Sequence, residues 1–201
     1  MYVSDFARNG TLQQVLTFYK QGVSYPIAGR DELVRLIAPL RSRYPSYASF
    51  GASRVEDLFA ASDLGQATVR EARTFASSVA IDQGKGTYKL EPLPVEAQFA
   101  PVYATVARDF DGDGRTDLML GGNLYGVQPM LGRYDASYGL LLRGVGDGRF
   151  VPVDMARSNV VIDGQVRDIK PFRSALGGEM IAVARNDEKL LILRSSTTPK
   201  P

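Results

Sequence analysis

The stretch Asp109-Phe110-Asp111-Gly112-Asp113-Gly114-Arg115-Thr116-Asp117 is the strongest indicator of fold and chemistry in this chain. Its acidic residues stand at positions 1, 3, 5 and 9 of one short loop that contains two glycines. A tight turn directs the odd-numbered side chains toward a common centre, where carboxylates repel one another unless a cation lies among them. Calcium suits this pattern because it accepts about six to eight oxygen ligands, including the backbone carbonyl at position 7. The loop therefore predicts a calcium site formed by Asp109, Asp111, Asp113, Arg115 and Asp117, and an ordinary Asp/Gly turn without metal is the alternative.

The residues on either side of the loop indicate which kind of calcium site this is. An EF-hand requires a glutamate at position 12 and a helix on each side, but position 12 here is Leu120. Upstream, apolar residues alternate over 102–106, and downstream 118–122 is a short apolar run that ends in glycines. Both patterns are typical of strands, so the loop is predicted to join two strands of a sheet.

Composition excludes several classes of function. The 201 residues include no histidine and no cysteine, which excludes Ser-His-Asp and Cys-His catalysis within this chain, and also zinc or haem sites built from these residues. The formal net charge of +2 is small and the basic residues are dispersed, which argues against nucleic acid as a partner. No segment approaches the roughly 18 apolar residues of a membrane span. We therefore expect no catalytic residues, no nucleic-acid partner and no membrane span.

Short segments recur along the chain at a spacing of about 60 residues. Gly84-Lys85-Gly86-Thr87-Tyr88 and Gly146-Asp147-Gly148-Arg149-Phe150 share two glycines and an aromatic residue, 62 positions apart. Ala107-Arg108-Asp109-Phe110 is matched by Val166-Arg167-Asp168-Ile169, 59 positions later. The repetition predicts a series of similar structural units.

Two further matches extend this series. Asn123 and Asn186 each end an apolar strand-like run, 63 positions apart. Asp5-Phe6-Ala7-Arg8-Asn9-Gly10 is interpreted as a degenerate copy of the acidic loop, and Asp168 as the start of another. A unit of this length with several short strands has the size of a β-propeller blade.

The acidic loop, together with the turn Gly146–Phe150 that follows it, resembles the FG-GAP or VCBS repeat, the blade of integrin-α-like propellers. The chain as a whole is similar to the C-terminal region of large bacterial VCBS-repeat proteins, including the segments Gln21–Pro26 and Gly132–Gly139. This resemblance implies a mostly β fold, namely an incomplete β-propeller of about three blades with a small helical insertion. It also implies one calcium ion, a non-catalytic role, and a location outside the cell, in the periplasm or on the outer cell surface.

The resemblance gives expected boundaries. A degenerate first blade would occupy 1–98, with the helical insertion at about 30–66, and a complete blade would follow at 99–156. A last, partial blade would occupy 157–195 and end in a disordered tail at 196–201. Because closed propellers use typically 4 to 8 blades, the remaining blades are expected in a longer chain.

The first hundred residues also carry local signals. Leu33, Leu36, Ile37 and Leu40 are spaced to form one face of a helix, which Pro39 should kink or end. Ser53-Arg54-Val55-Glu56 has the pattern of a capping box and predicts the start of a second helix. A long strand is expected at 69–81.

Two classes of function stay open. The first is a calcium-stabilised adhesion or binding module for a protein or glycan, and the second is an accessory or catalytic part of a carbohydrate-active enzyme that uses Asp135 or Asp163. Asp135 lies in a polar loop where an arginine, tyrosines and an acid could meet a sugar. The candidate ligand residues of this loop are Arg133, Tyr134, Asp135, Ser137 and Tyr138. A loop packed by its own tyrosines is the alternative.

Overall fold

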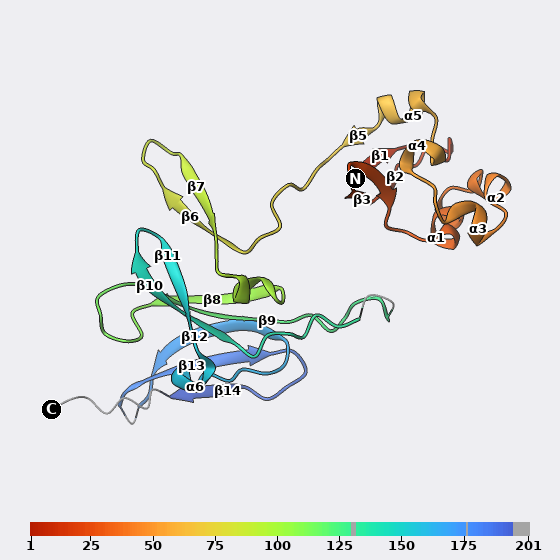
Figure 1. Ribbon diagram of the computed structural model, residues 1–201. Helices are drawn as coiled ribbons and strands as arrows, with labels where there is room; N and C mark the ends of the chain where they lie inside the picture. Colours follow the sequence, from red (N-terminus) through yellow and green to blue (C-terminus); the bar gives the residue numbers. More distant parts are fainter. Residues whose placement is uncertain (130–131, 176, 195–201) are drawn as a thin grey trace. The chain divides into compact units, whose positions relative to one another are not determined.

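The computed structural model describes residues 1–129, 132–175 and 177–194, and the predicted tail at 196–201 lies outside the described residues (Figure 1). The fold is mostly β, with 38% strand and 18% helix in several antiparallel sheets. The chain forms two compact units, Met1–Thr74 and Phe75–Pro201, so their boundary falls inside the range 1–98 expected for the first blade.

The first unit combines two small antiparallel sheets with short helices. One sheet has the order β2-β1-β5 and is built from β1 (Tyr2–Ser4), β2 (Gln13–Val15) and β5 (Thr68–Val69). The other pairs β3 (Thr17–Lys20) with β4 (Val23–Pro26). The helices are α1 (Arg30–Leu36), α2 (Leu40–Arg43), α3 (Tyr47–Phe50), α4 (Val55–Leu58) and α5 (Ala61–Gln66). They fall in the range 30–66 where the sequence predicts helix.

The core of this unit differs from the predicted helix face at one position. Leu33, Ile37 and Leu40 are buried with Phe6 and Val15 in one hydrophobic cluster. Leu36 is 47% exposed, so its assignment to the same face is wrong. The predicted face is also divided between two helices, because α1 ends at Leu36, before the proline, and Leu40 begins α2.

The predicted capping box is displaced by one residue. The N-cap of α4 is Arg54 rather than Ser53. Asp57, not Glu56, closes the box, because its Oδ2 accepts the Arg54 N–H at 2.9 Å. The Arg54 guanidinium beside it lowers the pKa of the Asp57 carboxyl to about 2. An acid in the first turn of a helix is favoured in either register, which is why the sequence alone did not separate them.

The second unit is built of antiparallel sheets whose paired strands follow one another in the chain (Figure 1). A hairpin joins β6 (Ser78–Asp82) to β7 (Tyr88–Pro92), and the 3-10 helix η1 (Val95–Gln98) follows. The four-stranded sheet has the order β11-β10-β9-β8, with β8 (Val102–Arg108), β9 (Asp117–Gly122), β10 (Leu140–Gly146) and β11 (Arg149–Val153). After α6 (Met155–Ser158), the three-stranded sheet contains β12 (Val166–Arg173), β13 (Glu179–Arg185) and β14 (Leu191–Arg194).

The predicted strand at 69–81 is wrong. β5 ends at Val69 and β6 begins at Ser78. β5 pairs with β1 of the first unit, whereas β6 pairs with β7 of the second. The residues between them belong to neither sheet, and an alternating pattern in the sequence cannot reveal that the pairing partner changes.

The two larger sheets of the second unit pack through apolar side chains that alternate along their strands. The shared cluster consists of Ala104, Val106, Met119, Ile162, Val166, Ile169 and Val183. A second cluster contains Leu120, Leu142 and Ala97. This packing holds β8 and β9 in place, so the two ends of the loop that connects them have fixed positions.

Two pairs of backbone features within this unit have similar geometry. The turn Gly84–Gly86 has φ angles of 79°, 55° and 75°, and the turn Gly146–Gly148 has 91°, 54° and 69°. Each turn closes a hairpin, β6 to β7 and β10 to β11. At the other end of the sheets, the Asn123 N–H donates to the Pro101 carbonyl at 3.1 Å, and the Asn186 N–H donates to the Gln165 carbonyl at 2.8 Å.

One predicted repeat is wrong in register. Asp168 lies inside β12, at a bulge between Val166 and Asp168, and does not begin a loop. The matching bulge in β8 lies between Val102 and Ala104, so Val166–Asp168 corresponds to the start of β8 rather than to its end. The matched segment 166–169 lies wholly within β12, whereas β8 ends at Arg108 and Asp109 already belongs to the loop.

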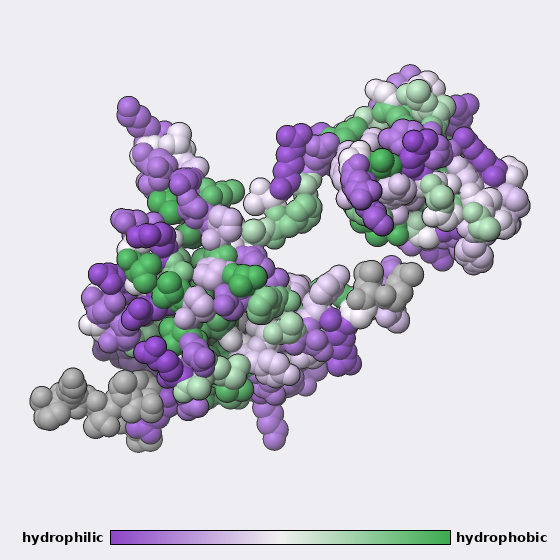
Figure 2. Space-filling model, viewed as in Figure 1, coloured by the Kyte–Doolittle hydropathy of each residue, from purple (hydrophilic) through white to green (hydrophobic). Residues whose placement is uncertain are grey.

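Apolar and polar residues share the surface. On the face shown in Figure 2, hydrophobic and hydrophilic residues are intermixed over each unit. Exposed apolar side chains include Tyr88, Leu90, Phe172 and Ile192. Among the described residues, no helix has both the length and the apolar character needed to cross a membrane.

Candidate metal centre

The acidic loop closes the hairpin of β8 and β9. Arg108 at the end of β8 pairs with Asp117 at the start of β9, which leaves eight residues between them. Gly112 and Gly114 have φ angles of 80° and 83°, in the left-handed region that glycine adopts without strain. The loop thus folds back on itself at positions 4 and 6, as expected for a connection between strands.

Asp109 organises the middle of the loop. Its Oδ1 accepts the Gly112 N–H at 2.7 Å and its Oδ2 accepts the Gly114 N–H at 2.9 Å. These backbone donors, with Gly114 first, lower the pKa of the Asp109 carboxyl below its ordinary value of 3.8. The carboxylate is therefore ionised at neutral pH and attracts positive charge.

Asp111 and Asp113 each hold the backbone two residues further on. Asp111 Oδ1 accepts the Asp113 N–H at 3.1 Å, and Asp113 Oδ1 accepts the Arg115 N–H at 2.8 Å. Asp113 Oδ2 also lies 3.5 Å from Nη1 of Arg115. The guanidinium of Arg115 therefore neutralises part of the charge on the Asp113 carboxylate.

Asp117 is the buried member of the loop. Asp117 is only 2% exposed. Oδ2 accepts the Phe110 N–H at 2.8 Å, and Oδ1 accepts the Gly144 N–H of β10 at 2.9 Å. A Cβ atom at Gly144 would clash with the Thr116 carbonyl, so the close approach of β10 to the loop requires glycine. Asp117 thus joins the loop to the next strand of the sheet.

The structure brings three of the four predicted acids together. One carboxylate oxygen from each of Asp109, Asp111 and Asp117 lies within 4.8 Å of the others, and this group could hold a metal ion. Asp113 is outside the group and faces Arg115. A carboxylate oxygen that accepts one backbone N–H keeps a second lone pair, so the hydrogen bonds that shape the loop leave donor atoms for a cation.

The candidate ligand loop is anchored at both ends. Tyr134 forms a two-way bridge with Leu124, with N–H to carbonyl distances of 2.8 and 2.9 Å. The Arg133 guanidinium lies 4.9 Å from the centre of the Tyr125 ring. Tyr138 is 54% exposed, and Asp135 is exposed as well. The tyrosines are thus not packed into a closed loop core, and they remain accessible to a ligand.

Asn123 fixes this loop to the sheet. The buried Asn123 side chain accepts the Ser137 N–H at 3.0 Å and donates to the Ser137 carbonyl at 2.7 Å. It also donates to the Gly164 carbonyl at 2.9 Å. Asn123 therefore connects the end of β9, the polar loop and the segment before β12.

The two aspartates proposed for catalysis lie in different surroundings. Asp163 forms an ion pair with Arg185, which also contacts Glu188 at 2.6 Å. Its carboxylate is held by this pairing, whereas Asp135 has no such ion pair among the described residues. Of the two candidate acids, only Asp135 is exposed without an ion pair among the described residues.

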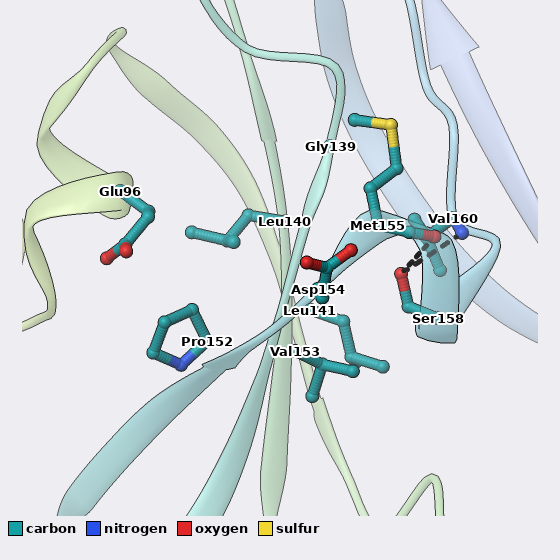
Figure 3. A pocket seen from close by; sticks show the side chains of 10 residues that line it. All are labelled: Glu96, Gly139, Leu140, Leu141, Pro152, Val153, Asp154, Met155, Ser158 and Val160. Atoms are coloured by element: carbon teal, nitrogen blue, oxygen red, sulfur yellow. Dashed lines mark hydrogen bonds between the residues drawn. The ribbon is translucent and has the colours of Figure 1, made fainter.

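A shallow hollow of about 440 Å³ lies beside β10, β11 and α6 and contains neither of these acids. Figure 3 shows Leu140 and Pro152 in the space between the carboxyls of Glu96 and Asp154. Asp154 Oδ1 accepts the Ala156 N–H at 2.7 Å and so serves as the N-cap of α6. The hollow is lined mainly by apolar side chains, and the cap role explains the presence of Asp154.

Several residues that shape these sites carry no recognisable motif. Gly144 allows β10 to approach the acidic loop closely, and Asn123 forms hydrogen bonds with a buried side chain. Both effects depend on contacts between segments far apart in the sequence. The signal for Asn123 in the sequence is its place at the end of a strand-like run, which is repeated at Asn186.

Comparison of the chain with protein-family models, with curated proteins and with solved structures gave no match.

Proposed function

We propose that the loop 109–117 binds one calcium ion, which stabilises the hairpin of β8 and β9. The observation that carries this proposal is the convergence of three carboxylates within 4.8 Å. Like charges at this separation repel one another, and a bound cation reverses the sign of the interaction. Asp109, Asp111 and Asp117 would be the first ligands, with Asp113 and the Arg115 carbonyl completing the shell. Calcium is favoured over magnesium because it accepts an irregular set of oxygen ligands.

We propose further that the two larger sheets are neighbouring blades of an FG-GAP-like β-propeller. Support comes from the shared position of the bulges in β8 and β12 and from the equivalent hydrogen bonds of Asn123 and Asn186. The remaining blades would belong to a longer chain. The exported location is part of the same proposal, and it predicts a calcium dissociation constant of about 0.1 to 1 mM, the range of extracellular modules.

In this proposal the chain is a non-catalytic binding module for a protein or glycan. The anchored polar loop with its exposed Tyr134 and Tyr138 would make the contact, since aromatic rings and an arginine suit sugar or protein surfaces. The enzyme alternative retains one specific observation in its favour, which is the exposed Asp135 beside these tyrosines.

Calorimetric titration of the chelator-treated chain with calcium tests the metal proposal. We expect one site in the wild type. Asp111→Ala removes a ligand whose other contact is an exposed backbone N–H, so affinity should fall by about tenfold or more, equivalent to at least ~1.4 kcal/mol. Asp147→Asn is the control, because that side chain is 92% exposed in a turn elsewhere in the unit and asparagine tolerates its φ of 54°. Equal affinity in the wild type and Asp111→Ala would refute the assignment.

A glycan array and a panel of polysaccharide hydrolysis assays separate the two classes of function. The binding module predicts retention of a ligand without turnover, and Tyr138→Ala should weaken that retention. The enzyme alternative predicts turnover that Asp135→Asn abolishes while calcium affinity and thermal stability stay unchanged. Turnover with this pattern would replace the binding-module proposal.

A further inference from the structure

The loop at the N-terminus has the same backbone design as the acidic loop. Ser4 pairs with Gln13 across β1 and β2, which leaves eight residues between them, as Arg108 and Asp117 do across β8 and β9. At position 4 of each loop, Arg8 has φ 54° and Gly112 has φ 80°. At position 6, Gly10 and Gly114 have φ angles of 81° and 83°. The two loops therefore turn at the same places.

The side chains at positions 1 and 5 make matching hydrogen bonds. Asp5 accepts the N–H of Gly10 at 2.7 Å, as Asp109 accepts that of Gly114 at 2.9 Å. At position 5, Asn9 accepts the N–H of position 7 at 3.0 Å, and Asp113 does the same at 2.8 Å. The lowered pKa of Asp5 has the same origin as that of Asp109, namely backbone N–H donors. The N-terminal loop thus holds the conformation of the acidic loop with only one carboxylate.

The two loops differ at position 9, which is Gln13 in the loop 5–13 and Asp117 in the loop 109–117. Gln13 is 7% exposed and its Nε2 donates to the Thr11 carbonyl at 2.7 Å and to Asn9 Oδ1 at 3.4 Å. These acceptors occupy positions 7 and 5, the same positions as the Arg115 carbonyl and the Asp113 side chain. The Oε1 atom of Gln13 accepts the Ala7 N–H at 2.9 Å, so the oxygen and the NH2 group of this amide both have partners within the loop.

We infer that the side-chain amide of Gln13 takes the place of a cation in the loop 5–13. Both hydrogens of the amide carry positive partial charge and point at oxygens that would otherwise face one another. One neutral donor suffices because the loop contains a single aspartate, whereas the loop 109–117 contains four. The loop 5–13 is therefore independent of calcium. The comparison rests on the proposed calcium site, but the role of Gln13 is tested without it.

Hydrogen-deuterium exchange of the intact chain, read by mass spectrometry, compares the two loops in one molecule. In the wild type, calcium should slow exchange in peptides that cover 109–117 and leave peptides that cover 5–13 unchanged. Gln13→Ala should speed exchange over 5–13 with calcium and with chelator alike, because the donors to Thr11 and Asn9 are lost. Peptides that cover 33–37 report whether the core of the first unit is still folded.

Gln13→Glu is the sharper variant because it keeps the size of the side chain. The carboxylate replaces the donor by an oxygen that faces the Thr11 carbonyl and Asn9, so the loop should open in chelator and close again when calcium is added. Gln98→Glu is the matched control. Gln98 likewise donates to two carbonyls, at 3.0 and 3.1 Å, and accepts an N–H at 2.7 Å, but it lies in η1 and not in a loop built on an aspartate. Its exchange should rise without any response to calcium.

The outcomes are distinct. Exchange over 5–13 that becomes calcium-dependent only in Gln13→Glu supports the inference. Calcium protection of 5–13 in the wild type, or a Gln13→Glu loop that exchanges equally with calcium and chelator, overturns it. If calcium does not change exchange over 109–117 in the wild type, the proposed function is refuted instead. The Gln13→Glu comparison still decides the role of the amide.

Discussion

At the scale of single residues, Asp117 and Asp111 have different tasks within the same loop. Asp117 is buried and accepts two backbone N–H groups, one from Phe110 in the loop and one from Gly144 in β10, whereas Asp111 is exposed and accepts one N–H of its own loop. A buried donor that loses its acceptor costs more free energy than an exposed one, because water cannot replace the partner. Substitution of Asp117 should therefore lower stability even without calcium, whereas substitution of Asp111 should mainly lower calcium affinity.

Asp117→Ala should lower the free energy of unfolding by roughly 2 to 4 kcal/mol even in chelator, because the N–H groups of Phe110 and Gly144 lose their acceptor. Asp111→Ala should change it by less than about 0.5 kcal/mol under the same conditions. Urea unfolding of both variants in chelator provides the measurement. Equal losses in the two variants would contradict the structural role of Asp117.

The pH dependence of the loop follows from Asp109. Its folded pKa lies below the ordinary value of 3.8, so the folded state binds fewer protons than the unfolded state at acid pH. The contribution of Asp109 is therefore complete above about pH 5 and is lost as the pH falls through the folded pKa. Thermal melts in chelator from pH 7 to pH 3 should show falling stability of the second unit. Asp109→Asn should flatten this dependence, and the exposed Asp147→Asn should not.

At the scale of elements, the buried Asn123 links β9, the polar loop and the segment before β12. Its φ of 77° means that alanine would add backbone strain to the loss of the side chain, whereas glycine would remove the side chain alone. Asn123→Gly should destabilise the second unit by roughly 2 kcal/mol, and Asn123→Ala by more. Chemical unfolding measures both. Equal stability of the glycine variant and the wild type would show that the three hydrogen bonds contribute little.

The sequence predicts those elements whose signals are local. The acidic loop lies between two strands, and the turns Gly84–Gly86 and Gly146–Gly148 share one backbone conformation, because glycine and aspartate restrict the backbone within a few residues. The predictions fail where the outcome depends on distant partners. The strand at 69–81 is divided because its two ends pair in different units, and Asp168 is in a strand because its register is set by β13. Asp113 turns to Arg115 through a contact that spacing does not encode.

At the scale of the whole molecule, the two units should respond differently to calcium. The acidic loop belongs to the second unit, and the loop 5–13 to the first. Calorimetric scanning should show the transition of the second unit rising by a few degrees at a tenfold excess of calcium over the dissociation constant, equivalent to about 1.4 kcal/mol. The transition of the first unit should stay in place. A shift of both transitions by the same amount would indicate that the units unfold together.

The strand order of the second unit also has a consequence for folding kinetics. Paired strands in its two larger sheets are neighbours in the chain, and the hairpin of β8 and β9 closes over only eight residues. Short loops close quickly and at small entropic cost, so such a hairpin is expected to form early, before β8 meets β12. A cation held in that loop would then already contribute in the folding transition state. We expect calcium to speed refolding in stopped-flow experiments, rather than only to slow unfolding.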